Sequence, residues 1–187
     1  MRVHTTSEAD ATGPLRNIYD RERANRGYVP NFARLFSLNP AAYEAWAALL
    51  SSIRERMDLR RYGLVTLAAA SALHSRYCVS AHGAILEAKF YPRPELEAIA
   101  HDYRSAGLDA TDVAIMAFAE KVARDAASMM DADIEDLRSR GLTDEEIFDV
   151  TLAAAARSFF SKTLDAMGAE PDAQLAGSAP LFDLIPG

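Results

Sequence analysis

The residues best suited to chemistry lie in one stretch, residues 73–83, which holds the only cysteine of the chain and two of its four histidines. Ser75 is a residue type that caps helices. As an N-cap it would accept a hydrogen bond from the backbone N–H of Cys78, the third helical residue. The positive end of a helix dipole lowers the pKa of a thiol and favours the nucleophilic thiolate. His82 follows four residues later, so it shares a helix face with Cys78 and can take or share its proton.

The same stretch also fits a purely structural role, as part of the packed core. A single cysteine among alanines and leucines is most often a small buried hydrophobe, and His82 would then be a core histidine bonded to backbone. Tyr77 and His74 flank the thiol and could donate to a bound oxygen, although a tyrosine here is commonly a packed ring. The candidate catalytic residues are therefore Cys78, His82, Ser75 and Tyr77, with Ser75 first of all a helix cap.

Composition limits the classes of function. Of 187 residues half are hydrophobic, and the formal net charge is −7. No basic patch has the density that nucleic acid requires, and no run of eighteen apolar residues could span a bilayer, so we expect neither nucleic-acid nor membrane partners. One cysteine and scattered histidines do not form a metal site, and no glycine-rich phosphate loop is present, so we expect no metal and no cofactor. Residues 1–10 lack the apolar segment of a secretory signal, and a lone cysteine makes no internal disulfide, which predicts a cytoplasmic protein.

Caps and breakers predict an all-α domain. Alanine dominates the apolar residues, and Val/Ile runs are few. Pro14 and Gly27 mark the ends of a first helix. Thr143 and Glu146 form a capping box that opens the last one. The predicted helices are 14–26, 31–37, 40–57, 59–74, 76–90, 94–105, one from a cap at 109 or 111 to 127, 132–140 and 144–167.

An internal repeat suggests how this domain is built. Residues 65–70 (VTLAAA) recur identically as residues 150–155. At the same offset Thr163, Met167 and Phe160 replace Cys78, His82 and Ser75, so the second copy keeps packing positions and loses the reactive ones. We expect a flexible N-terminal arm (1–13), a helical domain (14–168) with two related halves at about 28–90 and 109–168, and a C-terminal tail (169–187).

Three segments resemble the AhpD-like superfamily, which groups the alkylhydroperoxidase AhpD, carboxymuconolactone decarboxylases and peroxidase-related proteins. They are Tyr28-Val29-Pro30-Asn31, then Asp58-Leu59-Arg60-Arg61-Tyr62, then Tyr77-Cys78-Val79-Ser80-Ala81-His82-Gly83. The resemblance covers about residues 27–168. It implies an AhpD-like helical bundle with internal pseudo-symmetry and a homo-oligomer, usually a dimer, trimer or hexamer.

The resemblance also implies a redox motif, Cys-x-x-Cys-x-x-x-His, that this chain retains only in part. Cys78 falls on the second cysteine, which attacks peroxide, and His82 on the histidine that relays protons. Ser75 replaces the first cysteine, and Gly63 stands where a glutamate is expected, unless Glu87, Asp58 or another carboxylate substitutes for it. Serine cannot form a disulfide, so a sulfenic acid on Cys78 would be resolved by an external thiol or by a cysteine of a second subunit.

Three functions follow from these residues. The first is an antioxidant enzyme that reduces small hydroperoxides with one cysteine thiolate, His82 and an external thiol reductant. The second is a decarboxylase-like enzyme that uses general acid–base groups on a small lactone or carboxylate. The third is a non-catalytic oligomeric protein that kept the fold and lost the motif. The chain departs from the motif at two of four positions, and we take the first function as the prediction to test.

Overall fold

The computed structural model describes residues 1–186, which form helices and connecting loops without a strand. The main helices are α1 (Gly13–Arg26), α2 (Asn31–Leu35), α3 (Pro40–Arg54), α4 (Leu59–Ala72), α5 (Arg76–Lys89), α6 (Arg93–Asp102), α7 (Ala110–Asp125), α8 (Asp131–Ser139) and α9 (Asp144–Ala166). Short 3-10 helices lie between or after them, at Phe36–Leu38, Ala126–Ser128, Ala173–Leu175 and Ala179–Leu184. The predicted all-α class is confirmed.

Local chemistry explains most of the helix ends. Asp58 caps α4 by accepting from the Arg61 N–H, and Thr143 opens α9 with the predicted capping box. Gly27 ends α1 in the left-handed conformation (φ 82°), which costs a residue without Cβ little. Helix α3 ends at Arg54, three residues before the predicted end at 57. The apolar spacing on which the prediction rests continues past Arg54, although the chain there turns toward α4.

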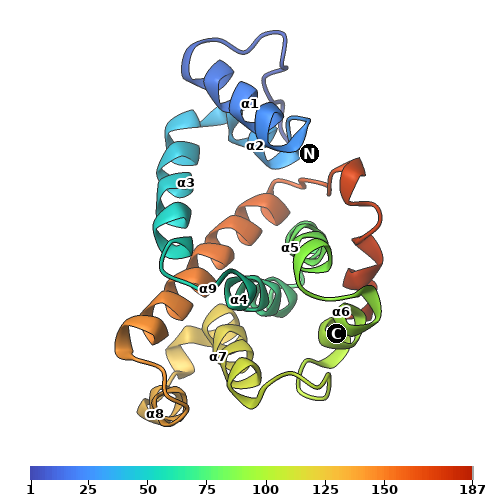
Figure 1. Cartoon of the computed structure of the whole chain (residues 1–187). Coiled ribbons are helices and arrows are strands. Elements are labelled where there is room, and N and C mark those ends of the chain that lie inside the picture. Colours follow the sequence, from blue (N-terminus) through green and yellow to red (C-terminus); the bar gives the residue numbers. More distant parts are fainter. Residues whose placement is uncertain (187) are drawn as a thin grey trace.

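Helix α4 is the central element of the fold. Its residues from Tyr62 to Ala70 are all buried, as expected for a helix that is apolar nearly all round. It packs against α5, α7 and α9, and Figure 1 shows these three helices surrounding it. The repeated VTLAAA segments lie in α4 and α9, two helices that pack on each other.

Ion pairs to two buried carboxylates link α4 and the loop before it to neighbouring helices. Asp112 on α7 is 1% exposed and accepts from Arg60 at 2.6 Å and Arg61 at 2.9 Å. Asp149 on α9 pairs with Arg56 in the loop before α4. A buried carboxylate needs such partners, so these contacts set how α7 and α9 sit against α4.

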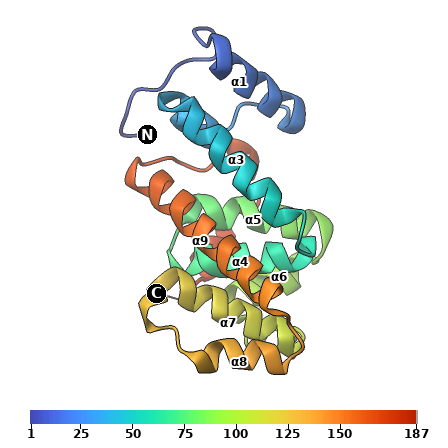
Figure 2. The same cartoon turned by 90° about the vertical axis from the view of Figure 1, so that its left-hand side faces the viewer.

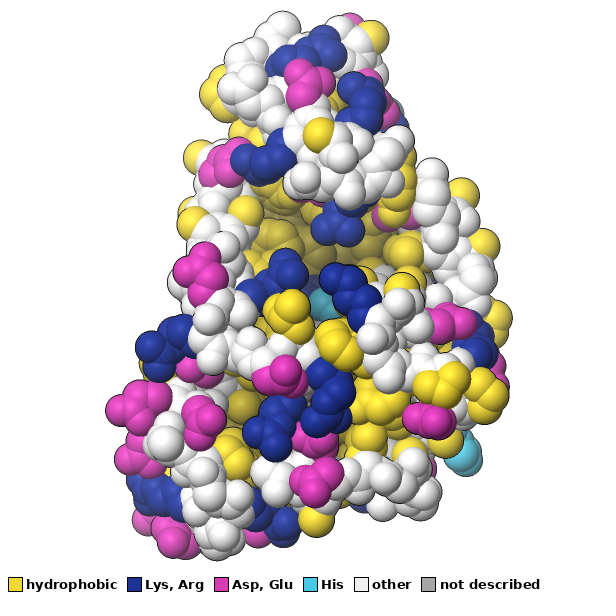
Figure 3. Space-filling model, in the orientation of Figure 1, with side chains coloured by type: hydrophobic (Ala, Val, Ile, Leu, Met, Phe, Trp, Pro, Cys, Tyr) yellow, Lys and Arg dark blue, Asp and Glu magenta, His cyan; other side chains and the backbone are white. Residues whose placement is uncertain are grey.

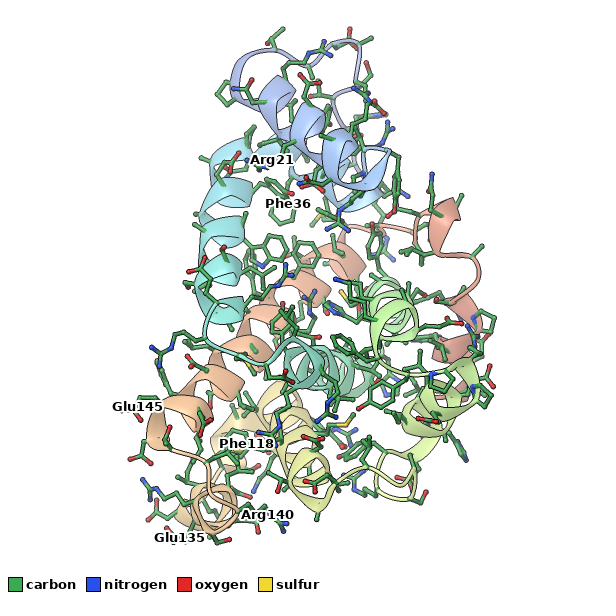
Figure 4. All side chains as sticks on the ribbon, viewed as in Figure 1. Arg21, Phe36, Phe118, Glu135, Arg140 and Glu145 are labelled. Atoms are coloured by element: carbon green, nitrogen blue, oxygen red, sulfur yellow. The ribbon has the colours of Figure 1, made fainter. Side chains whose placement is uncertain are left out.

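Different helices form the two ends of the molecule. Helices α1 and α2 form one end and α8 the other, as the rotated view also shows (Figure 2). Arg21 and Phe36 lie near the first end, and Glu135 and Arg140 lie at the second, on α8 and at its C-terminus (Figure 4). Helix α3 links the first end to the centre and places its aromatic residues over α9.

The terminal segments pack on the helices. The Arg2 N–H donates to the Met167 carbonyl at the end of α9, and the Thr6 carbonyl accepts from the Tyr19 hydroxyl. Leu181, in the segment predicted as a tail, is fully buried against Gly83 of α5, where any Cβ would meet the Leu181 side chain. The tail therefore packs on its own subunit.

Candidate functional site

A cavity of about 130 Å³ lies between α3, α4, α5 and α9. Its walls include Cys78 and His82 from α5, together with Trp46, Tyr62 and Phe160 from three other helices. Figure 3 shows a hollow in this face of the molecule, with apolar walls and several Lys and Arg side chains around it. Cys78 and His82, two of the residues predicted to form the site, therefore both line this cavity, and its other walls come from distant segments.

Helix α5 positions the thiol as predicted, but the cap does not act as predicted. The helix begins at Arg76, so Cys78 is its third residue. Ser75 makes no side-chain capping bond, which corrects that expectation. Its hydroxyl is fully buried and donates instead to the Asp165 carboxylate of α9 at 3.1 Å, a charged acceptor that forms a stronger hydrogen bond than a backbone group. Ser75 is not among the residues that line the cavity.

His82 is held as a neutral imidazole. Its Nδ1 lies 3.0 Å from the Thr66 hydroxyl, which is itself within 3.0 Å of the Tyr62 and Gly63 carbonyls. Because the hydroxyl gives its one proton to a carbonyl, it accepts from Nδ1–H, and this assigns the free lone pair to Nε2. Burial lowers the pKa of His82 well below 6.5, and the charges of Arg157, Arg54 and Arg26 lower it further.

The thiol of Cys78 is 1% exposed and contacts a buried cation. Arg157 of α9 is only 4% exposed and donates from Nη1 to the Cys78 Sγ at 3.6 Å. Its guanidinium also lies 5.4 Å from the centre of the Phe160 ring.

Tyr77 presents its ring to the cavity and directs its hydroxyl elsewhere. The hydroxyl donates to the Asp172 carboxylate, which also accepts from the Asn31 N–H at 2.7 Å. Burial and the hydrogen bond to Asp172 raise the pKa of Tyr77 above its usual range. The side chain thus connects α5 to the start of α2 and to the C-terminal segment.

No carboxylate lines the cavity in the described part of the chain. Glu87 pairs with Arg93 at 3.2 Å, and Asp58 is engaged as the cap of α4. Gly63 borders the cavity on α4, and a Cβ there would lie 2.6 Å from the fully buried Leu86 of α5. Close packing of α4 on α5 thus explains the glycine, and neither proposed substitute for the missing glutamate reaches the site.

Sequence reasoning missed the basic and aromatic wall. The sequence patterns assign no site role to Arg157, Arg54, Phe32 or Trp46. The structure instead stacks Trp46 on Phe160 at 4.1 Å between ring centres, beside the cavity. A lone buried-looking arginine within the alanine-rich α9 was the one available signal, because arginine is seldom placed on a buried helix face without a partner.

These elements define an all-α protein with the AhpD-like fold. No protein-family model matches the chain, and no curated protein matches it in sequence. The structural similarity is nevertheless extensive. The AhpD core of a peroxidase-related protein from Ralstonia eutropha JMP134 superposes with a TM-score of 0.84 at 24% identity, over 93% of each chain.

Two further structures extend the comparison. A peroxidase-related protein from Silicibacter sp. TM1040 gives a TM-score of 0.81 at 24% identity, over 94% of this chain and 95% of that one. The debrominase Bmp8, as a Cys-to-Ala variant in complex with 2,3,4-tribromopyrrole, gives 0.80 at 18% identity over 97% of both chains. The resemblance predicted from sequence is confirmed at the level of the fold, and the debrominase shows that this fold supports more than one activity.

Neither a metal-binding group nor a helix able to cross a membrane is found among residues 1–186. Within residues 1–186, no three His, Cys, Asp or Glu side chains come together as a metal-binding group. None of the described helices combines the length and apolarity that crossing a bilayer requires.

Proposed function

We propose that this chain is a peroxidase-related member of the AhpD-like superfamily that reduces small hydroperoxides through the single thiolate of Cys78. The observation that carries the proposal is the contact between the Arg157 guanidinium and the Cys78 sulfur inside a cavity. A thiolate next to a fixed positive charge is the species that attacks peroxide oxygen. The cytoplasm, where thiols stay reduced, is the compartment that suits a lone catalytic cysteine.

The reaction can be written with these groups. As the Cys78 sulfur attacks the terminal hydroxyl oxygen of ROOH, His82 Nε2 relays the thiol proton toward the departing oxygen, so that no imidazolium persists beside the arginines. A sulfur–oxygen bond forms and the oxygen–oxygen bond breaks, which leaves Cys78 as a sulfenic acid. The departing RO⁻ takes the proton back from His82 as ROH. The low pKa of His82 favours this return, because the imidazolium is unstable beside three arginines.

An external thiol then completes the cycle. The sequence has no second cysteine, so a small thiol R′SH attacks the sulfenic sulfur, releases water and forms a mixed disulfide. A second R′SH releases the Cys78 thiol and leaves as R′SSR′. In this scheme Cys78 and His82 are catalytic residues, whereas Tyr77 and Ser75 position α5 through Asp172 and Asp165.

Hydroperoxide consumption in the presence of excess dithiothreitol tests the proposal. We expect turnover of cumene hydroperoxide by the wild type and none by Cys78→Ser. In a separate reaction without added thiol, dimedone should trap a sulfenic acid on Cys78 alone. Ser80→Ala on the same helix is the matched control. If the wild type neither consumes peroxide nor reacts with dimedone, the non-catalytic alternative is the better description.

A second candidate, a decarboxylase-like acid–base enzyme, is favoured by one observation. The cavity is cationic, as a site for a small carboxylate would be, and its histidine is neutral and free at Nε2. General base catalysis by His82 requires no thiol. Activity on a small lactone carboxylate that survives Cys78→Ala and is lost in His82→Gln would support this function over the first.

We also propose that the protein is a homo-oligomer. Helix α9 exposes apolar side chains at helical spacing: Phe148 is 61% and Phe159 50% exposed, and Leu152 and Ala155 lie between them. Large apolar side chains on one helix face are typical of subunit contacts. Light scattering should show a dimer or larger species that Phe148→Ser/Phe159→Ser converts toward monomer, whereas a monomeric wild type would contradict the proposal.

A further inference from the structure

The charge of the cavity wall is one-sided. Four basic side chains line it, from Arg26, Arg54, Lys89 and Arg157, and no Asp or Glu of residues 1–186 does. Among the described residues, a carboxylate pairs with only one of these four, Arg26, which contacts Glu22 at 2.8 Å. The whole chain is acidic, with a net charge of −7, so this concentration of positive charge is local to the cavity.

Arg157 is exceptional among the buried charges. Asp112 has Arg60 and Arg61, and Asp149 has Arg56. Arg157, at 4% exposure, has no carboxylate partner among the described residues. An uncompensated buried charge is strongly unfavourable, so an anion that enters the cavity would be stabilised there.

The hydrogen-bonding groups of the wall point to the same ligand. Three cavity-lining residues hold buried donors for which the described residues supply no acceptor: Arg157 at Nε, Tyr62 at its hydroxyl and Trp46 at Nε1. Arg54 adds a guanidinium, 5.7 Å from the centre of the Tyr62 ring. Buried polar groups are almost always satisfied. A ligand that satisfied these donors would have to bring acceptor oxygens, as a carboxylate or a phenolate does.

The shape and lining of the cavity set the rest of the ligand. Its other walls are aromatic, with Phe32 and Phe160 at 5.5 Å between ring centres and Trp46 stacked on Phe160. The volume of about 130 Å³ is close to that of an engineered apolar cavity known to hold one benzene molecule, about 150 Å³. A flat molecule of one ring fills this space, and aromatic walls favour a planar partner.

We infer that the cavity binds a small planar organic anion, a single-ring carboxylate or phenolate, whose oxygens meet Arg157 and Arg54 and whose ring lies between the aromatic side chains beside Cys78. This inference deepens the proposed function, on which it rests for the role of the site, by naming the class of substrate. A hydroperoxide or lactone that carries such an anionic group would be held with its reactive atoms near the thiol. Neutral alkyl hydroperoxides would bind more weakly.

Trp46 provides the test, because it is the only tryptophan of the chain and it lines the cavity. The full-length Cys78→Ser variant removes thiol chemistry and is titrated with benzoate, benzamide and inorganic phosphate, by Trp46 fluorescence and by calorimetry. We expect saturable benzoate binding at least about tenfold tighter than that of benzamide or phosphate, since a charge-assisted bidentate contact is worth at least that factor.

Variants assign the binding to the basic wall. Adding Arg157→Met or the more exposed Arg54→Met should weaken benzoate binding about tenfold or more, whereas Arg138→Gln on α8, which pairs with Asp144, should change nothing. Met has a similar length and carries no charge to bury, so Arg157→Met is expected to fold, and Arg54→Met decides the question if it does not. Equal affinity for benzoate and benzamide, or no benzoate binding at all, would overturn the inference.

Peroxide turnover by the wild type separates this inference from the proposed function. Turnover without benzoate binding rejects the anion site and leaves the peroxidase. Benzoate binding without turnover rejects the peroxidase and leaves the site. Phosphate that binds as tightly as benzoate would reject the ring component and therefore the inference as stated.

Discussion

The Nη1 of Arg157 lies 3.6 Å from the Sγ of Cys78, although the two residues are 79 positions apart in the chain. The contact joins α9 to α5 across the floor of the cavity. Arginine keeps its charge at every accessible pH, so the sulfur has a permanent positive neighbour. The cation that contacts the sulfur therefore comes from α9, the helix that also carries the second VTLAAA segment.

Alkylation should report this contact directly. We expect iodoacetamide to modify Cys78 about tenfold more slowly in Arg157→Met than in the wild type at pH 7, because the variant lacks the cation that contacts the attacking sulfur. Mass spectrometry of the time course measures the rate. Arg138→Gln, far from the cavity, should react like the wild type. Equal rates in Arg157→Met and the wild type would show that the guanidinium does not activate the sulfur.

The acid sensitivity of the fold should depend on His82. Its pKa in the folded protein is far below the unfolded value of about 6.5. The unfolded chain therefore binds the extra proton first, and stability falls as the pH drops below about 6.5. The loss approaches about 1.4 kcal/mol per pH unit for this one group.

Urea unfolding at pH 5 to 7.5 measures this loss. In His82→Gln the contribution of the histidine is absent, while the contributions of the carboxylates remain. The difference between the two proteins should therefore change steeply below pH 6.5 and be flat above it. A difference that is constant over the whole range would contradict the assignment of a buried neutral imidazole.

Tyr77→Phe tests a positioning role. The variant loses the hydrogen bond to Asp172, a buried carboxylate at 6% exposure, and we expect the free energy of unfolding to fall by about 2 kcal/mol. The ring remains in the cavity wall, so kcat for peroxide should stay within about a factor of two while Tm falls. A loss of kcat without a loss of stability would instead make the Tyr77 hydroxyl a participant in the chemistry.

The sequence predicted local features well, since they depend on neighbouring residues. Helix ends followed from caps such as Asp58 and Thr143 and from stops such as Gly27. Cys78 and His82 shared a helix face because four residues make about one helical turn.

The features that the sequence could not predict, namely the partner of Ser75 and the walls of the cavity, depend on contacts between distant segments. The partner of Ser75 is Asp165, 90 residues away, and no local pattern could place that carboxylate beside the hydroxyl. Trp46 had the spacing of a core residue, which does not distinguish a cavity wall from a filled core. The sequence shows that residue 157 is an arginine. Only the packing of α3, α5 and α9 shows that no carboxylate of residues 1–186 lines the cavity beside it.

In Ser75→Cys, the introduced cysteine should resolve the sulfenic acid on Cys78 in place of an external thiol. Residues three apart at a helix start have Cα atoms about 5 to 6 Å apart, within the range that a disulfide spans. The Asp165 carboxylate beside this position disfavours a second thiolate there, so Cys78 remains the attacking sulfur. One equivalent of hydroperoxide should oxidise Cys78, and the introduced thiol should then condense with it.

The measured result should be the loss of both free thiols and of two hydrogen atoms in mass, with no bound external thiol. Ser80→Cys is the matched control, since position 80 is equally buried on α5 but residues two apart on a helix do not face each other. That control should keep one free thiol and form a mixed disulfide with the added reductant. If Ser75→Cys also gives only the mixed disulfide, then residue 75 is held too far from Cys78 for the two-cysteine reaction, as its engagement with α9 rather than the cavity would explain.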